Sequence, residues 1–108
     1  MPDTPVRRYP AVDVGNGATR RVLSESPELM MVEVAFTSEG VGPEHSHPHV
    51  QSTFVKSGRF EFTVGGRSFE VGPGDAFVIP SKALHGCRAL GVPGVLIDTF
   101  TPRRDDFL

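Results

Sequence analysis

Glycine and proline recur so often along this chain that long amphipathic helices are nearly excluded. Together they account for 22 of the 108 residues, against roughly one in eight in an average protein. Between these breakers lie short segments in which apolar and polar residues alternate, the pattern of a half-buried strand. The segment Phe60–Val64 is the clearest example. We therefore expect short strands joined by tight turns.

The alternating segments recur at intervals of roughly 8 to 12 residues. The Gly65-Gly66 pair between two of them predicts a tight hairpin. The segments expected as strands are 29–36, 50–56, 60–64, 67–71, 76–79, 84–90 and 95–101. No space remains for a crossover helix. These features predict an all-β fold with about eight or more short antiparallel strands, arranged as a barrel or double-sheet jelly roll.

Length and the breaker pattern predict one structural domain. Residues 1–20 contain five glycines and prolines and no sustained periodicity. We expect them to form an extended N-terminal arm that packs on the core or on a partner chain. Residues 21–108 are expected to form the β-barrel domain.

Charge and composition exclude several function classes. Eleven basic and thirteen acidic residues leave a net charge of −2, which gives no electrostatic footprint for nucleic acid or an anionic membrane. The apolar runs are too short to span a bilayer, and the first ten residues lack the apolar core of a signal peptide. Cys87 is the single cysteine, which suits a reducing compartment. We expect a cytoplasmic protein.

Three of the four histidines, His45, His47 and His49, lie within five residues, and His85 follows 36 positions after His49. On one extended strand the first three would share a face with Gln51. Two imidazoles two positions apart, joined by a third from another strand, form a natural metal site. A solvent-exposed histidine-rich loop is the alternative. Strand parity does not distinguish His49 from the other two.

The last apolar segment places an acidic residue on an inward face. Leu96, Asp98 and Phe100 alternate with more polar positions, so a carboxylate would point into the core. A buried carboxylate is costly unless it is paired or used. The simple alternative is an Asp98 paired with an arginine, for which Arg20, Arg59 and Arg104 are the candidates. In the absence of other information, the consecutive charged residues 103–106 are expected to be exposed to solvent.

The segments GPEHSHPHVQSTFVKSG and VGPGDAFVIPSKALHG resemble the two metal-binding motifs of cupins, which are small jelly-roll β-barrels. The resemblance spans about residues 30–101. It implies that the metal ligands are His45, His47, Gln51 and His85. Gln51 stands where many cupins have glutamate. Such a neutral ligand set would leave the ion its full charge and differs from the two-histidine, one-carboxylate set of non-haem iron oxygenases.

The C-terminal tail extends the resemblance to one group, the pectin-degradation cupins, over roughly residues 18–108. The segments LMMVEVAF and LHGCRAL support it. Members of that group convert 4,5-unsaturated uronates to linear, ketonised forms and hold a metal with three histidines and a glutamine. The resemblance implies that Asp98 and Arg104 are catalytic, and that Phe100 and Arg104 bind substrate. Val50 departs from a position that is commonly glutamate there, which leaves substrate identity open.

The leading hypothesis is thus a metal-dependent enzyme acting on unsaturated uronates from pectin or alginate. The alternatives are a cupin dioxygenase or isomerase for another small molecule, and a non-catalytic cupin that binds a sugar acid. Histidine and amide ligands accept nickel, zinc, iron or manganese, so one divalent ion is expected without a named element. Apolar residues on both faces of 50–55 favour a homodimer formed through sheet faces.

Overall fold

Alternation of apolar and polar residues produces ten strands in residues 6–108, the part of the chain that the computed structural model describes. The strands are β1 (Val12–Gly15), β2 (Ala18–Ser26), β3 (Leu29–Phe36), β4 (Val41–His45), β5 (Val50–Ser57), β6 (Phe60–Val64), β7 (Arg67–Val71), β8 (Ala76–Ile79), β9 (His85–Ala89) and β10 (Gly94–Thr101). One 3₁₀ turn, η1 (Asp105–Phe107), follows near the C-terminus. No helix among the described residues has the length and apolar character needed to cross a membrane.

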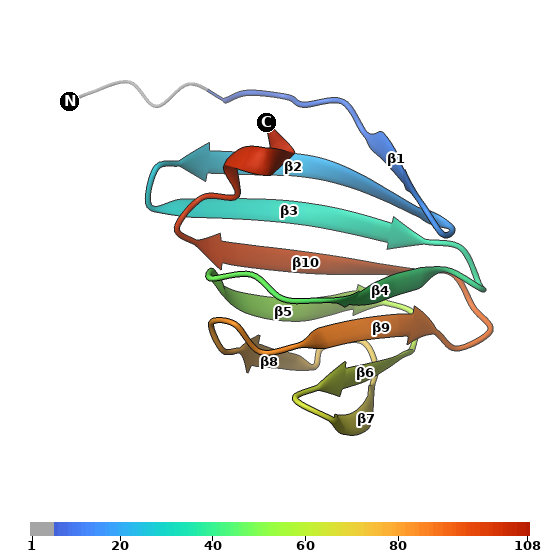
Figure 1. Cartoon of the computed structure of the whole chain (residues 1–108). Coiled ribbons are helices and arrows are strands. Elements are labelled where there is room, and N and C mark those ends of the chain that lie inside the picture. The colour runs from blue at the N-terminus through green and yellow to red at the C-terminus, as the bar shows by residue number, and fades with distance from the viewer. Residues whose placement is uncertain (1–5) are drawn as a thin grey trace.

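The strands form two antiparallel sheets (Figure 1). The six-stranded sheet has the order β1-β2-β3-β10-β5-β8, and the four-stranded sheet has the order β4-β9-β6-β7. Most neighbours in these orders are distant in sequence, which is typical of a jelly roll. The predicted all-β, antiparallel, jelly-roll fold is therefore confirmed, with two facing sheets as its layers.

Two apolar clusters divide the interior along β10. Leu96 joins a cluster with Phe36, Phe60 and Val55, whereas Phe100 joins a second cluster with residues of β2 and β3. Each fully buried side chain of this size stabilises the fold by about 1.5–3 kcal/mol. Asp98 lies on the same inward face, between the two clusters. The interior is thus apolar except in one zone around Asp98, which contains the buried polar side chains.

The expected boundary between an arm and a domain at residue 20 does not coincide with a structural boundary. Strand β2 crosses it, and Ala18 pairs with Phe36 of β3. The glycines that suggested an irregular arm instead form a hairpin, since Asn16 and Gly17 adopt φ values of 55° and 75°, as a tight β-turn requires. The first five residues of the expected arm lie outside the described part of the chain.

The histidine-rich segment is not one continuous strand. β4 ends at His45 in the four-stranded sheet, and β5 begins at Val50 in the six-stranded sheet. The intervening loop is held by a hydrogen bond from the Lys82 amide to the His47 carbonyl (2.8 Å). Pro48 lacks an amide hydrogen and so cannot donate to a strand ladder. The chain therefore crosses between the two sheets within this segment.

Candidate metal centre and acid–base site

Strand register brings two histidines together, and the crossing loop adds a third. His45 at the end of β4 pairs with His85 at the start of β9, and their ring centroids lie 4.4 Å apart. The ring of His47 lies 4.9 Å from that of His85. One ligand nitrogen from each of the three lies within 4.8 Å of the others. His45 is exposed and the other two are buried, so the cluster extends inward from the surface.

Backbone carbonyls orient all three imidazoles in the same way. The Nδ1 atoms of His45 and His85 lie 2.9 Å from the carbonyl oxygens of Pro43 and Ala83, and Nδ1 of His47 lies 3.1 Å from that of His49. A carbonyl only accepts, so each Nδ1 carries the proton and each Nε2 offers a lone pair. Nε2 of His85 is buried without a hydrogen-bond partner. This is the arrangement that metal-binding histidines adopt.

Burial keeps two of these imidazoles neutral. Desolvation is the main cause that lowers the pKa of His47, and the positive charge of Arg104 lowers it further. Desolvation likewise lowers the pKa of His85, against a hydrogen bond to the Ala83 carbonyl that raises it. Neutral imidazole is the form that binds metals.

Gln51 completes the set of expected ligands. Its Oε1 lies 3.1 Å from Nε2 of His47, and both atoms are acceptors when His47 carries its proton on Nδ1. Two acceptors facing each other are unfavourable unless a cation lies between or beside them. The orphaned His85 nitrogen and this acceptor pair fit a divalent ion held by three imidazoles and an amide oxygen.

Thr53 and Asp98 extend this arrangement into the interior. Nε2 of Gln51 donates to Oγ1 of Thr53 at 2.9 Å, and that hydroxyl donates to Oδ1 of Asp98 at 2.8 Å. Thr53 lies directly opposite Asp98 in the β5–β10 register. Burial raises the pKa of Asp98 to about 6, although hydrogen bonds from Thr53 and Gln51 and the charge of Arg104 act in the opposite direction. A carboxyl with this pKa exchanges protons near neutral pH.

Arg104 is part of a buried aromatic and ionic cluster. Its Nε and Nη2 donate to the two carboxylate oxygens of Asp106 at 3.1 and 2.9 Å. Its guanidinium carbon lies 4.2 Å from the ring centre of Phe107, which Arg20 covers at 3.8 Å. The default expectation of a solvated charge run is therefore wrong for Arg104, which is only 9% exposed. The stacking on Phe107 and the bidentate ion pair explain this burial.

The arginines considered as simple partners for Asp98 have other contacts. Arg20 stacks on Phe107, Arg59 lies 3.9 Å from Glu70, and Arg104 pairs with Asp106. Asp98 instead accepts a hydrogen bond from the neutral hydroxyl of Thr53. Within residues 6–108 the carboxyl thus has no direct ion pair, which favours a chemical use over simple structural pairing.

The remaining candidates lie around this centre. Phe100 is 3% exposed and meets the ring of His47 edge-on at 5.6 Å. The ring centre of His49 lies 5.4 Å from that of His47, but His49 is not part of the cluster formed by the other three histidines.

Burial raises the pKa of Cys87 to about 12, so it remains a thiol that packs on the apolar cluster. Val50 is exposed and, by strand alternation, faces away from Gln51.

Sequence reasoning missed three residues of this site: Thr53, Asp106 and Phe107. Thr53 had a usable signal, because it follows Gln51 by two positions and so shares its strand face. Asp106 and Phe107 belong to the tail that carries the family resemblance, but spacing gave them no role, since η1 lies beside β2 only through the path of the folded chain (Figure 1).

The chain is similar to known proteins over nearly its whole length. The cupin domain model matches residues 32–100. The pectin degradation protein KdgF of Dickeya dadantii (strain 3937) is 37% identical over 110 residues, which cover 95% of this chain and 100% of that one. The KdgF structure from Halomonas sp. has a TM-score of 0.87 and 40% identity, covering 93% of this chain and 92% of that chain.

A cupin of RmlC-like type from Shewanella frigidimarina NCIMB 400 gives a TM-score of 0.88 with 36% identity, covering 93% of this chain and 89% of that chain. The family model, the sequence similarity and the structural similarity are all consistent with the jelly-roll fold and its two histidine-bearing segments. The chain therefore belongs to the cupin family, where it resembles the pectin degradation protein KdgF.

Proposed function

We propose that this cupin is a metal-dependent enzyme that promotes ring opening and ketonisation of 4,5-unsaturated uronates, the sugar acids released from pectin or alginate by lyases. The observation that carries the proposal is the unpaired, buried Asp98, linked through Thr53 and Gln51 to three converging histidines. The resemblance to KdgF, whose Dickeya dadantii form is named a pectin degradation protein, supports this choice of substrate class.

His45, His47, His85 and Gln51 would hold one divalent ion, which when bound supplies Lewis acidity toward substrate oxygens. All four ligands are neutral in this role, so the ion would retain its full positive charge. That charge favours an anionic substrate such as a uronate. Nickel, zinc, iron and manganese all accept imidazole and amide ligands.

The proposed reaction adds water across the C4=C5 bond, with the proton on C4 and the oxygen on C5. The resulting C5 hemiketal opens to a linear ketone. Asp98 would donate the proton to C4 in its acid form and recover a proton from the attacking water in its carboxylate form. A pKa of about 6 suits both directions near neutral pH.

Arg104 and Phe100 would bind the substrate. The ion pair with Asp106 uses Nε and Nη2 of Arg104, which leaves Nη1 to donate to the substrate carboxylate. The ring of Phe100 packs against both the ring of His47 and the guanidinium of Arg104. Its ring would exclude water from one side of the bound sugar.

The test combines metal analysis with turnover. The purified protein is incubated with pectin- and alginate-derived unsaturated monomers, and the loss of their ultraviolet absorbance is followed. We expect wild type and the exposed-site control Val92→Glu to exceed the spontaneous rate and to contain metal. His47→Ala should lose metal, and Asp98→Ala should keep metal but fall to the spontaneous rate. Equal rates for wild type and Asp98→Ala on both substrates would reject the proposal.

Two further features belong to the same proposal. We place the enzyme in the cytoplasm, because its one free cysteine suits a reducing compartment. We also propose a homodimer, because the outward face of the six-stranded sheet presents Phe54 and Val78 at 43% and 61% exposure.

A further inference from the structure

We propose that Thr53 is a positioning residue that determines which end of the Gln51 amide faces the three histidines. This inference rests on the proposed metal centre and concerns its assembly. Only the amide oxygen is a useful ligand, yet the oxygen and the nitrogen of an amide are almost equal in size. Shape alone therefore does not select the binding orientation. Some hydrogen-bonding partner has to select it.

The hydroxyl of Thr53 has one hydrogen, which fixes the polarity of its contacts. While Asp98 is ionised, that hydrogen is donated to its Oδ1 at 2.8 Å, because a carboxylate oxygen accepts only. Toward Gln51 the hydroxyl therefore acts as an acceptor. It receives a hydrogen bond from Nε2 at 2.9 Å, which turns Oε1 toward His47, 3.1 Å away.

Burial makes this selection effective. Thr53 is 0% exposed and Gln51 is 5% exposed, so solvent does not supply alternative partners. A flipped amide would set its oxygen against a hydroxyl whose only hydrogen is already used. It would also direct the amide nitrogen, which offers no lone pair, at the metal position. A buried group left unsatisfied in this way disfavours the flipped orientation.

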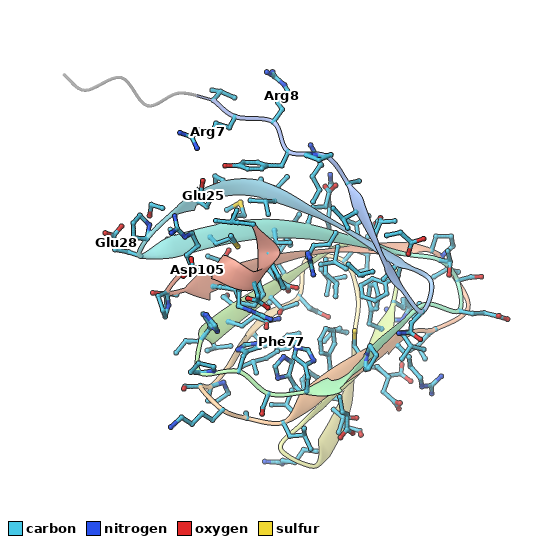
Figure 2. All side chains as sticks on the ribbon, turned by 45° about the horizontal axis from the view of Figure 1, so that its top comes forward. Arg7, Arg8, Glu25, Glu28, Phe77 and Asp105 are labelled. Carbon is cyan, nitrogen blue, oxygen red and sulfur yellow. The ribbon has the colours of Figure 1, made fainter. Side chains whose placement is uncertain are left out.

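Register explains why Thr53 occupies this position. It lies opposite Asp98 on β10 and opposite Phe77 on β8, and Figure 2 shows Phe77 among side chains between the sheets. Gln51, two positions earlier, shares the same inward face of β5. Thr53 thus contacts the expected ligand on one side and the expected acid–base group on the other, without reaching the histidines itself.

The first test compares metal affinity among matched variants. Thr53→Val keeps the shape and removes the hydroxyl, Thr53→Ser keeps the hydroxyl, and Ser52→Val removes an exposed hydroxyl from the same strand. Calorimetric titration of the metal-free proteins with Ni²⁺ and Zn²⁺ gives the Kd. We expect Thr53→Val to raise it about 10- to 100-fold, as for other residues that orient metal ligands. Thr53→Ser and Ser52→Val should stay close to wild type.

The second test uses a ligand that has no wrong end. In Gln51→Glu both terminal atoms are oxygens, so orientation no longer matters. Thr53→Val should therefore cost much less metal affinity in a Gln51→Glu background than in wild type. The visible absorption spectrum of the Co²⁺-loaded proteins should change with Thr53→Val and should match wild type in Thr53→Ser. Thr53→Ala is measured in parallel, so that the comparison does not depend on one variant folding.

Several results would overturn the assignment. It fails if Thr53→Val binds Ni²⁺ and Zn²⁺ as wild type does, if Thr53→Ser loses as much affinity as Thr53→Val, or if the loss is undiminished in the Gln51→Glu background. In these cases the proposed metal enzyme stands. A wild-type protein that binds none of these ions would reject the metal centre and, with it, this role for Thr53.

Discussion

Asp98 occupies a position where its neighbours on the same strand face, Leu96 and Phe100, are apolar. Its raised pKa has a consequence for stability, because burial favours the protonated form. Between about pH 4 and pH 6 the folded protein binds a proton that the unfolded chain has released. The contribution of Asp98 to the free energy of unfolding therefore decreases as pH rises through this window.

We expect metal-free Asp98→Asn to be more stable than metal-free wild type at pH 7, by about 1–3 kcal/mol. The difference should vanish as the pH falls toward 4, where wild type is also neutral at this position. Urea unfolding at several pH values measures it. The control Glu39→Gln, at an exposed position, should follow wild type. A constant difference between pH 4 and 7 would contradict the raised pKa.

Arg104 gives a prediction on substrate binding. Arg104→Lys keeps the positive charge but loses the planar fork that binds Asp106 and the substrate carboxylate. We expect kcat/KM to fall about 10- to 100-fold, mainly through KM, since hydrogen bonds to charged groups are worth roughly 1.5–3 kcal/mol. Steady-state kinetics measures this. Arg103→Lys, which alters the neighbouring pair with Glu25, serves as control. An equal effect in both variants would argue against a specific role.

Residue spacing alone predicted part of the site. Two-residue spacing marked His45 and His47 as metal candidates, and alternation along β10 placed Asp98 inward. The expectation that Gln51 is a ligand came only with family resemblance. The contact of Arg104 with Phe107 was beyond reach, because it depends on how the chain turns after β10 rather than on any local period.

At the scale of elements, η1 places the C-terminal segment against the proposed substrate-binding residues Arg104 and Phe100. Arg20 of β2 and Arg104 both stack over the ring of Phe107, and this ring meets Phe100 edge-on at 5.7 Å. Figure 1 shows this turn beside β2, close to the C-terminus. Figure 2 labels Asp105 on the same turn. The segment after β10 therefore supports a residue proposed to bind substrate.

We expect Phe107→Ala to raise KM about 2- to 10-fold with little change in kcat, because each cation–π contact contributes roughly 0.5–2 kcal/mol to the position of its arginine. Leu108→Ala, at an exposed neighbouring residue, should leave KM unchanged. Initial-rate measurements over a range of substrate concentrations decide between them. A fall in kcat alone, with KM intact, would show that Phe107 does not act through substrate binding.

Elements were predictable where one face of a strand is buried. Strands β3 and β6 follow the alternating pattern, and Gly65-Gly66 joins β6 to β7 as expected. Prediction failed at two places. At Asn16-Gly17 the turn depends on positive φ angles, and between His45 and Val50 the chain passes from one sheet to the other. Local alternation does not say to which sheet a strand belongs.

At the scale of the molecule, the outward face of the six-stranded sheet gives a prediction about assembly. Phe54, Val78 and Met31 are exposed on it at 43%, 61% and 39%. We expect a dimer in light scattering coupled to size exclusion, and a monomer for Phe54→Glu, because a charge on this face opposes its burial. Val92→Glu, in the turn before β10, should remain dimeric. A monomeric wild type would contradict the proposed homodimer.

The position of the histidines between the layers has a mechanical consequence. His45 and His85 belong to one sheet and Gln51 to the other, whereas near Gly94 the sheets are joined by packed Phe36 and Phe60. An ion bound at the polar end would bridge the two sheets there, while apolar packing holds them together at the opposite end. Amide hydrogen exchange in β4 and β9 should then slow on metal addition, while exchange near Phe60 stays the same. Local separation of the two sheets, rather than global unfolding, would then limit the rate at which the ion dissociates.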